Sequence, residues 1–330
     1  MQPVVIFGAG GYSGLELVRR LAGHPRLKVT HASSDRAAGT PVSDLVPEAD
    51  PALSFSRHDA VMEAVTDEAI VCLATPAETS AELAPRLLER GARVVDLSGA
   101  FRLTDLASFA QWYGFEHPCP ELVEEAAYGL PELLPIPAGA RLVANPGCYA
   151  TAAILAVAPL LTNGLAASGP IVIDGKSGTT GAGKKASEAL LFSEVGENLR
   201  PYRLTKHQHT PEIERALTTL SGKDVRVGFV AHLVPMRRGI LVSAYLPAAE
   251  GVTDAKLEEA YRSTYDPNGF VRFSRTPPET GHVQFTNHVE VHARVDPRID
   301  HILAFAAIDN LVKGAAGQAI QNVEALLEAR

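Results

Sequence analysis

Val4-Val5-Ile6-Phe7-Gly8-Ala9-Gly10-Gly11-Tyr12-Ser13-Gly14 is the stretch that decides the fold of the first half of the chain. The unbroken apolar run is typical of a buried parallel strand, and an amphipathic helical pattern follows over Leu15–Ala22. Glycines between a strand and a helix permit a tight turn and let backbone amides approach a pyrophosphate at the helix N-terminus. The stretch therefore predicts a dinucleotide-binding Rossmann domain, with candidate cofactor contacts at Gly8, Gly10, Gly11, Tyr12, Ser13 and Gly14.

The second predicted strand, Leu27–Ser33, bears on the choice of dinucleotide. An NAD-specific fold usually carries an acid at the end of this strand, but Ser33 and Ser34 stand there, followed by Asp35 and Arg36. Hydroxyls and a guanidinium suit a 2′-phosphate, so Ser33, Ser34 and Arg36 indicate NADP rather than NAD. The alternative is that Asp35 and Arg36 are ordinary solvated turn residues.

Further strands and helices alternate along the first half, which favours a doubly wound parallel sheet. Ligands of such a sheet bind at the C-terminal ends of its strands. Arg102 follows the strand at Arg93–Leu97 by a few residues, so it is a candidate for the ligand-binding site. The alternative is that Arg102 is an ordinary surface arginine. The other expected elements are strands at Ala69–Ala74 and Leu142–Ala144 and a helix at Glu78–Arg90.

Asn145-Pro146-Gly147-Cys148-Tyr149-Ala150-Thr151 is the candidate centre of the chemistry. A strand, a tight turn and a helical pattern over Tyr149–Leu161 place Cys148 at the first turn of a helix, where the dipole favours thiolate over thiol. The local pattern leaves two interpretations open, a nucleophile or a buried structural cysteine.

The second half has strands that follow one another without a helix between each pair, which predicts a largely antiparallel α+β domain. A final helix rich in small residues, from Asn310 to about Ala329, is expected to pack back on the first domain. We therefore predict a nucleotide domain of residues 1–148 plus 310–330, and a catalytic and oligomerisation domain of residues 149–309. The expected strands are Pro170–Asp174, Val225–His232, Ile240–Tyr245, His288–Val295 and Ile302–Ile308, and the expected helices are Lys185–Phe192, Pro211–Leu220 and Asp254–Thr264.

Two further segments carry candidate chemistry. Gly175–Lys185, between a strand and an expected helix, is predicted to form an anion cradle of backbone amides and lysines for a substrate phosphate or the cofactor. Its candidates are Lys176, Ser177, Gly178 and Lys184; an NTPase P-loop is rejected because Lys185 stands where the Mg²⁺-binding hydroxyl belongs.

The segment Lys206–Glu212 supplies what a thiol nucleophile needs, a base and an orienting acid. His207 and His209 straddle one residue before a helix, and Glu212 falls in the first turn of that helix. No third ligand stands out, so we expect no metal.

Composition excludes several classes of partner. The 330 residues carry a net charge of −8, which disfavours nucleic acid and anionic membrane surfaces. The start of the chain shows no signal-peptide pattern, and no apolar run approaches the roughly 20 residues that span a bilayer. Cys72, Cys119 and Cys148 lack paired or metal-like spacing, which fits a reducing cytoplasm.

Taken in order, these motifs resemble one enzyme family. The glycine loop, Asn145–Thr151, Lys176–Lys185, His207–Glu212, His232-Leu-Val-Pro-Met-Arg-Arg-Gly239 and Asp309–Gln318 are similar to those of the N-acetyl-γ-glutamyl-phosphate reductases of arginine biosynthesis, over essentially the whole chain. Pro-Gly-Cys-Tyr and His-x-His-x-Pro-Glu are specific to that family, whereas the glycine loop is shared with the wider semialdehyde dehydrogenase group.

The resemblance implies NADPH-dependent reduction of an acyl phosphate to an aldehyde, in a Rossmann domain followed by a glyceraldehyde-phosphate-dehydrogenase-like domain, within a homo-oligomer, a dimer or a tetramer. It implies Cys148 as the nucleophile and His209 as the base, supported by His207 and Glu212, although the order of the two histidines stays open. Anion binding by Arg102 and Arg238, a place for Asn145 in the substrate site and one for Asn310 near the nicotinamide are also implied. Lys184 departs from the arginine common in the family.

Two alternatives remain. The same chemistry on a carrier-linked aminoadipyl phosphate of lysine biosynthesis uses nearly the same motifs, whereas aspartate-semialdehyde dehydrogenases place Asn, not Gly147, before the cysteine. A non-catalytic NADP-binding protein is the alternative of another class, and an inert Cys148 thiol would indicate it.

Overall fold

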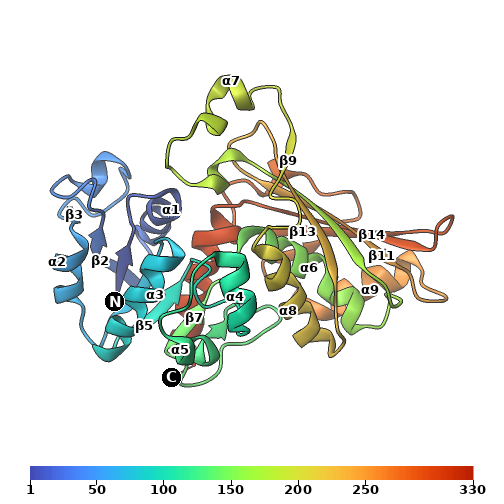
Figure 1. Cartoon of the computed structure of the whole chain (residues 1–330), viewed down its shortest axis with the longest axis horizontal. Coiled ribbons are helices and arrows are strands. Elements are labelled where there is room, and N and C mark those ends of the chain that lie inside the picture. Colours follow the sequence, from blue (N-terminus) through green and yellow to red (C-terminus); the bar gives the residue numbers. More distant parts are fainter. Residues whose placement is uncertain (330) are drawn as a thin grey trace. The chain divides into compact units, whose positions relative to one another are not determined.

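The structure is a computed structural model that describes residues 1–329, and it divides into two compact units (Figure 1). Unit 1 consists of Met1–Gly147 together with the C-terminal segment that begins at Ala315, and unit 2 is Cys148–Gly314. Cys148 and Gly314 are thus the first and last residues of unit 2.

Unit 1 is built on a parallel sheet, which confirms the predicted doubly wound class. Within residues 1–329 this sheet has seven strands in the order β3-β2-β1-β4-β5-β7-β6, all paired in parallel. The order reverses between β1 and β4, the position at which such sheets open a ligand crevice. The strands are β1 (Gln2–Phe7), β2 (Leu27–Ser33), β3 (Phe55–Ser56), β4 (Ile70–Leu73), β5 (Arg93–Asp96), β6 (Ala127–Tyr128) and β7 (Leu142–Ala144).

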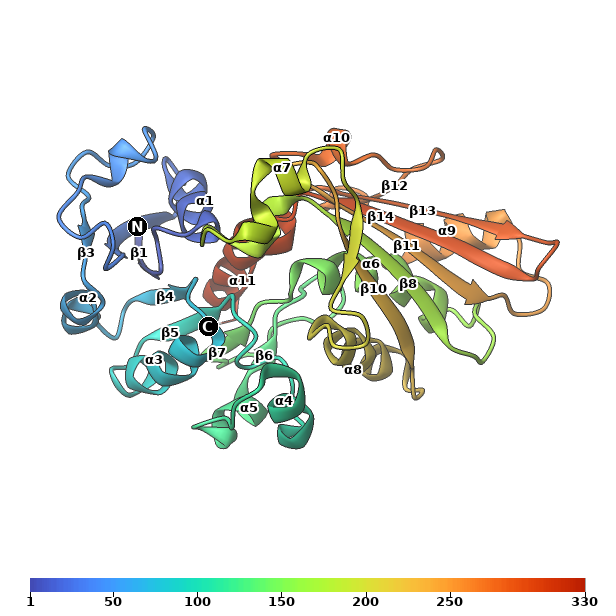
Figure 2. The ribbon, with the colours of Figure 1, turned by 45° about the horizontal axis from the view of Figure 1, so that its top comes forward.

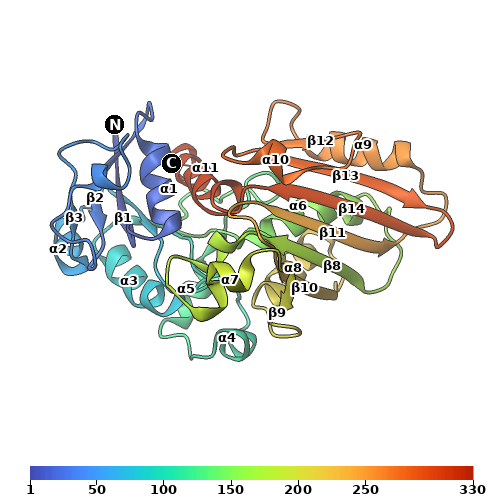
Figure 3. The same ribbon diagram turned by 90° about the horizontal axis from the view of Figure 1, so that it is seen from above.

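Helices cover both faces of this sheet because successive residues of a strand point to opposite sides. Val4 and Ile6 of β1 belong to one buried cluster, with α1 and α11, while Val5 and Phe7 belong to another, with α2, α3 and α5. Helices α1 and α11 lie side by side (Figure 3). The helices of unit 1 are α1 (Tyr12–Leu21), α2 (His58–Ala64), α3 (Ala77–Glu89), α4 (Leu106–Tyr113), α5 (Pro120–Glu125) and α11 (Gly317–Glu328).

Unit 2 carries a mixed sheet that is largely antiparallel, as predicted. Within the described residues it has seven strands in the order β12-β13-β14-β11-β8-β10-β9, of which β8–β10 and β12–β13 pair in parallel. Figure 2 shows its long strands side by side. The strands are β8 (Ile171–Ser177), β9 (Arg200–Tyr202), β10 (Val227–Leu233), β11 (Ile240–Pro247), β12 (Val271–Phe273), β13 (Val289–Asp296) and β14 (His301–Ile308).

One face of this sheet packs on three helices, α6 (Cys148–Thr162), α8 (His209–Ser221) and α9 (Asp254–Thr264) (Figure 1). Helix α6 is apolar all round and buried along almost its whole length, so it forms the core of the unit. Tyr265 Oη donates a hydrogen bond of 2.7 Å to the Leu155 carbonyl, which fastens α9 to α6. Two short helices, α7 (Phe192–Val195) and α10 (Thr280–Val283), lie in the connections.

One predicted element is wrong. The helix expected at Lys185–Phe192 is a 3₁₀ turn at Glu188–Leu190 followed by α7, and Phe192 is 91% exposed. An amphipathic pattern without an apolar surface to pack on does not hold a helix. The helix predicted from Asn310 to about Ala329 begins as a π-helical turn at Val312–Ala316 and continues without a break as α11.

No helix within residues 1–329 is both long enough and apolar enough to cross a membrane.

Candidate active site

The glycine loop of unit 1 leads from β1 into the first turn of α1. Gly8 has a φ of +75°, a conformation that glycine adopts without strain. A Cβ on Gly14 would lie 2.4 Å from the Gly8 carbonyl oxygen, and a Cβ on Gly10 would lie 2.5 Å from Ser34 Oγ. The backbone therefore packs where side chains do not fit. The first-turn N–H groups of α1, from Tyr12 and Ser13 onward, lack intrahelical acceptors, and this cradle fits a pyrophosphate.

The end of β2 is arranged around two buried serines. Ser33 Oγ accepts a hydrogen bond of 3.3 Å from the Gly8 N–H, and Ser34 covers Gly10. Asp35 Oδ1 instead accepts 3.0 Å from the N–H of His58, the first residue of α2. This carboxylate therefore caps the start of α2, and the exposed Arg36 is the charged group next to it.

Cys148 is the first residue of α6, at the positive end of the helix dipole. The next residue, Tyr149, anchors this end of the helix: its Oη donates 3.0 Å to the His232 carbonyl, and its ring occupies the space above Gly175, where a Cβ would lie 2.5 Å from ring carbons. The helix that presents the cysteine is therefore held firmly to the sheet of unit 2.

The histidine pair lies beside Tyr149. The rings of His207 and His209 lie 5.5 Å and 6.0 Å from that of Tyr149, centroid to centroid. Tyr202 and Phe229 complete an aromatic cage around His207, at 5.6 Å and 5.1 Å. The structure thus brings both predicted histidines next to the residue that follows the predicted nucleophile.

The two imidazoles occupy different environments. Burial lowers the pKa of His207 to about 2, with the neighbouring His209 and Arg203 as further causes. Its Nδ1 accepts a hydrogen bond of 3.3 Å from the His209 N–H, so His207 is a neutral ring with its proton on Nε2. His209 Nε2 lies 4.0 Å from Oε2 of the buried Glu212, both in the first turn of α8.

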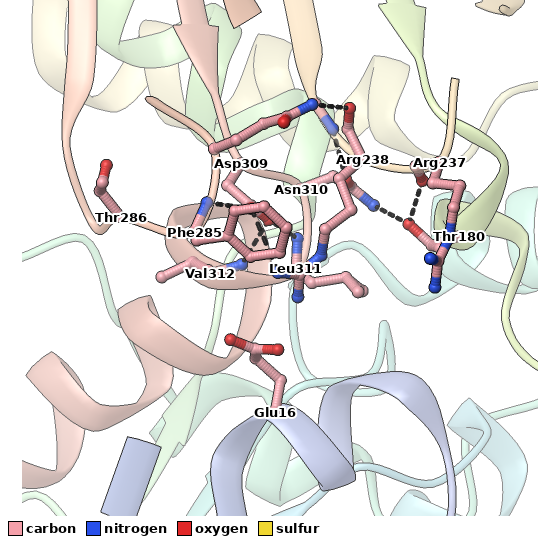
Figure 4. Close-up of polar contacts among 12 residues, drawn as sticks. Glu16, Thr180, Arg237, Arg238, Phe285, Thr286, Asp309, Asn310, Leu311 and Val312 are labelled. Carbon is pink, nitrogen blue, oxygen red and sulfur yellow. Dashed lines mark hydrogen bonds and ion pairs between the residues drawn. The ribbon is translucent and has the colours of Figure 1, made fainter. Parts of the chain in front are cut away.

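A buried polar network follows β14 (Figure 4). Asp309 is fully buried; its carboxylate accepts from the N–H groups of Leu311 and Phe285 and lies 3.5 Å from Arg238 Nη1. The Arg238 guanidinium also lies 4.7 Å from the Phe285 ring centroid. Arg238 is therefore held in one place by an opposite charge and an aromatic face.

Asn310 is a clamp between loops. Its Nδ2 donates 3.0 Å to Thr180 Oγ1, and its Oδ1 accepts 2.8 Å from the Gly239 N–H (Figure 4). The amide that the resemblance places near a nicotinamide thus joins the loop after β8 to the loop before β11. Its contact with a cofactor remains a prediction.

The expected anion cradle in the loop after β8 is not formed by its first amides. The N–H groups of Gly178, Thr179 and Thr180 donate to the carbonyls of Gly239, Met236 and Arg237, at 2.9–3.2 Å. Donors used in this way are not available to an anion. Ser177 is buried, and its Oγ donates to the Gly178 carbonyl.

The two predicted lysines do not lie with Tyr149. Lys176 alternates with Gly175, so its side chain extends from the sheet face opposite α6, where Nζ donates 3.1 Å to Ser243 Oγ. Lys184 is exposed in the following loop. The prediction that both lysines line the substrate site therefore lacks support from their placement, for Lys176 most plainly.

Arg102 and Asn145 come together in unit 1. Arg102 Nε donates 2.8 Å to the Asn145 carbonyl and Nη2 donates 2.7 Å to the Leu97 carbonyl. Asn145 Oδ1 accepts 2.9 Å from Asn322 Nδ2 of α11. The arginine therefore braces the segment that leads into Cys148, and α11 holds the same segment from the C-terminal end of the chain.

The roles of Asp309, Tyr202 and Asn322 were not predicted from the sequence. Asp309 had a detectable signal, since an acid directly after a buried strand caps the turn that follows. Tyr202 and Asn322 act through contacts between distant segments, which spacing does not reveal. Among residues 1–329, no group of three or more His, Cys, Asp or Glu side chains is placed to hold a metal ion.

Comparison with known families defines the class of protein. Residues 3–137 match the model described as "Semialdehyde dehydrogenase, NAD binding domain", and residues 148–310 match "Semialdehyde dehydrogenase, dimerisation domain". The fold is that of aspartate semialdehyde dehydrogenase II of Vibrio cholerae in complex with ASA (TM-score 0.75, 17% identity, covering 99% of this chain and 98% of that one). A probable aspartate-semialdehyde dehydrogenase from Pseudomonas aeruginosa is also similar (TM-score 0.71, 19% identity, covering 99% and 98%).

Sequence relatives narrow the class. N-acetyl-gamma-glutamyl-phosphate reductase of Halorhodospira halophila is 45% identical, covering 98% of this chain and 94% of the relative, and that of Brevibacillus brevis is 42% identical, covering 99% and 96%. The chain belongs to the N-acetyl-γ-glutamyl-phosphate reductase family. It is an oxidoreductase of arginine biosynthesis with NADP as its cofactor, as the resemblance implied.

Proposed function

We propose that this chain reduces N-acetyl-γ-glutamyl phosphate to N-acetylglutamate semialdehyde, with release of phosphate, through a thioester on Cys148. The observation that supports this most directly is Cys148 at the first turn of α6 with the His207–His209 pair beside the next residue, Tyr149. A thiolate at a helix N-terminus is a strong nucleophile toward an acyl phosphate, and covalent capture divides one difficult step into two easier ones.

Proton transfer is assigned to His209. His207 stays neutral because burial lowers its pKa to about 2, and its Nδ1 is engaged by the His209 N–H. His209, with Glu212 at 4.0 Å, is the imidazole that can hold a proton near an opposite charge. His207 is a positioning residue that fixes the backbone at the start of α8.

In the proposed reaction, each proton and each electron pair has a named donor and acceptor. His209 takes the proton of the Cys148 thiol as sulfur attacks the acyl carbon, and it passes that proton to the phosphate oxygen as the C–O bond breaks. The Gly8–Gly14 loop would hold NADPH, which would supply the hydride needed to reduce the acyl carbon. Collapse of the resulting oxyanion breaks the C–S bond, releases the aldehyde and returns the thiolate, which solvent protonates. N–H groups at the start of α6 stabilise the oxyanion.

Anion recognition is assigned to Arg238 and Arg102. Arg238 is fixed by Asp309 and Phe285, so binding a substrate oxyanion costs it little side-chain entropy. Arg102 is fixed by the carbonyls of Leu97 and Asn145. Lys176 and Lys184 are not assigned to the substrate, since Lys176 extends from the opposite face of the sheet and Lys184 is exposed.

The assembly is assigned to the sheet face of unit 2 that lies opposite α6. On this face Val172 is 45% exposed, and Leu241, Tyr245, Leu303 and Phe305 are partly exposed. Apolar side chains on the strands of a wide sheet suit a self-complementary contact with a second copy of the chain. A homodimer through this face, working in the cytoplasm with its free cysteines reduced, agrees with the matched dimerisation-domain model.

A single-turnover experiment tests the covalent step. Enzyme mixed with N-acetyl-γ-glutamyl phosphate in the absence of NADPH is expected to release one equivalent of phosphate per site and to gain one acyl group on the Cys148 peptide by mass spectrometry. Cys148→Ala should show neither signal while keeping NADPH affinity, and His209→Asn should slow the burst by roughly 10²–10³-fold. Turnover by Cys148→Ala would overturn the proposal, and faster acylation by a carrier-linked aminoadipyl phosphate would reassign the substrate.

A further inference from the structure

We propose that Gly314 is a positioning residue for Cys148: the π-turn Val312–Ala316 places a residue without a side chain against the cysteine and thereby sets where the thiol lies. This inference rests on the proposed role of Cys148. A Cβ added at Gly314 would lie 2.7 Å from Cys148 Cβ and 3.2 Å from Cys148 Cα. Two carbon atoms do not approach to 2.7 Å, so any side chain at this position displaces the cysteine or the turn.

Position 314 requires glycine because there is no room for a side chain, and not because of its backbone conformation. The φ of Gly314 does not fall in the left-handed region, so an L-residue meets no backbone strain there. On its other side the added Cβ would lie 3.3 Å from Ile308 Cδ1. The side-chain position of residue 314 is therefore enclosed by Cys148 and by the end of β14. Only a hydrogen atom fits there without movement of the neighbouring atoms.

The turn that carries Gly314 is fixed at its start. The Gly314 N–H donates 3.0 Å to the Asp309 carbonyl, and the Asp309 carboxylate accepts from Leu311 and Val312 at 2.8 Å and 3.1 Å (Figure 4). Asp309 is in turn held by the Phe285 N–H at 2.7 Å. A π-turn is uncommon within helices and is frequent at functional sites, which suits a turn that places one residue against a reacting group.

The backbone of Cys148 is held in place as well, because the next residue, Tyr149, is hydrogen-bonded to the His232 carbonyl and packs on Gly175. With both partners held, the closed contact between Gly314 and Cys148 sets the position of the sulfur. Errors of about 1 Å in the placement of a nucleophile cost on the order of 10²-fold in rate. We expect the cost at Gly314 to appear in the chemistry of the thiol and not in cofactor affinity.

The test compares Gly314→Ala with Gly281→Ala, a glycine of unit 2 whose added Cβ meets nothing within 4 Å. Gly314→Ala should lower kcat by about 100-fold and should change the pH profile of Cys148 alkylation by iodoacetamide. The KM for substrate and the Kd for NADPH should each change by less than about threefold. Gly281→Ala should leave all of these values unchanged. Alkylation is measured on the Cys148 peptide, so it reports on the thiol even if the proposed reaction is wrong.

A second variant gives the direction of the effect. Ile308→Val removes Cδ1, so the turn can move away from Cys148. The double variant Gly314→Ala/Ile308→Val should therefore have a kcat at least fivefold higher than that of Gly314→Ala alone. If Gly314→Ala does not fold, Asp309→Asn weakens the start of the turn from the other side and should change the same alkylation profile. A folded Gly314→Ala enzyme with unchanged kcat and alkylation profile would overturn the inference, as would an unchanged profile in Asp309→Asn.

Discussion

The loops after β1 and after β8 are both rich in glycine and both satisfy part of their own N–H groups within the protein, but only the first of them leads into a helix start that can bind an anion. The loop of unit 1 ends in a ten-residue helix, α1, whose first-turn donors lack acceptors within the helix. In the loop of unit 2, the donors of Gly178, Thr179 and Thr180 bond to the segment 236–239. The same residue type thus serves ligand access in one unit and close packing of two backbones in the other. Composition alone does not distinguish the two uses.

Substitution of one glycine in each loop should separate these roles, and this is the largest effect we expect. Gly14→Ala places a Cβ 2.4 Å from the Gly8 oxygen and should raise the Kd for NADPH about 100-fold, since loss of a few pyrophosphate contacts costs roughly 3 kcal/mol. Gly178→Ala places a Cβ 2.7 Å from the Arg237 oxygen, so it should lower the melting temperature and leave NADPH affinity intact.

Gly228→Ala is the control, because its added Cβ would meet nothing within 4 Å, so it should change neither quantity. Fluorescence titration with NADPH and thermal melts measure both quantities. Equal loss of affinity in Gly14→Ala and Gly178→Ala would contradict the division of roles.

The end of β2 is the part of unit 1 that we expect to contact the 2′-phosphate of NADPH. Arg36→Ala should weaken NADPH about tenfold, equivalent to about 1.4 kcal/mol, and should leave NADH affinity unchanged. The control is Arg57→Ala, which removes another exposed arginine of the same unit, the residue that precedes α2. The same loss for NADH as for NADPH would show that Arg36 does not contact the 2′-phosphate.

The smallest effect concerns the buried ring in unit 2. The folded-state pKa of His207, about 2, lies below the unfolded value near 6.5, so the ring contributes stability above pH 6.5 that is lost as pH falls toward the folded value. Between pH 7 and 5.5 the free energy of unfolding should fall by about 1 kcal/mol on this account. His207→Gln should reduce this pH dependence in urea melts, whereas His301→Gln, at the first residue of β14, should retain it. Parallel curves for wild type and His207→Gln would contradict the assignment.

Local sequence patterns sufficed for most of the fold because burial and periodicity act over short segments. The run Val4–Phe7 lies at the centre of a parallel sheet, and the alternation in Ile302–Ile308 matches a strand with one covered face. The predicted helix at Lys185–Phe192 failed because its apolar residues find no partner surface, a property that the segment itself does not encode. β9 was missed because it is a short edge strand that contains Pro201.

The site was predictable to the extent that its residues lie near turns and helix starts. Cys148, His209 and Glu212 occupy first turns, where sequence indicates both position and electrostatics. The cage around His207 depends on Tyr202 and Phe229, which come from different strands, so its low pKa arises only from tertiary packing. The side of the sheet that Lys176 faces also depends on tertiary packing, because a strand residue one position from Gly175 faces the opposite side, and its place in the substrate site stays a prediction.

The helix cap formed by Asp35 constrains how the cofactor preference can be redesigned. Oδ1 of this carboxylate already accepts from the His58 N–H, so a ribose bound by Asp35 would compete with the cap of α2. An engineered acid would have to replace Ser34, whose hydroxyl lies above Gly10 at a distance that leaves no room for a methyl group there. A switch toward NADH therefore has to remove Arg36 while it keeps both the helix cap at His58 and the close packing of Ser34 on Gly10.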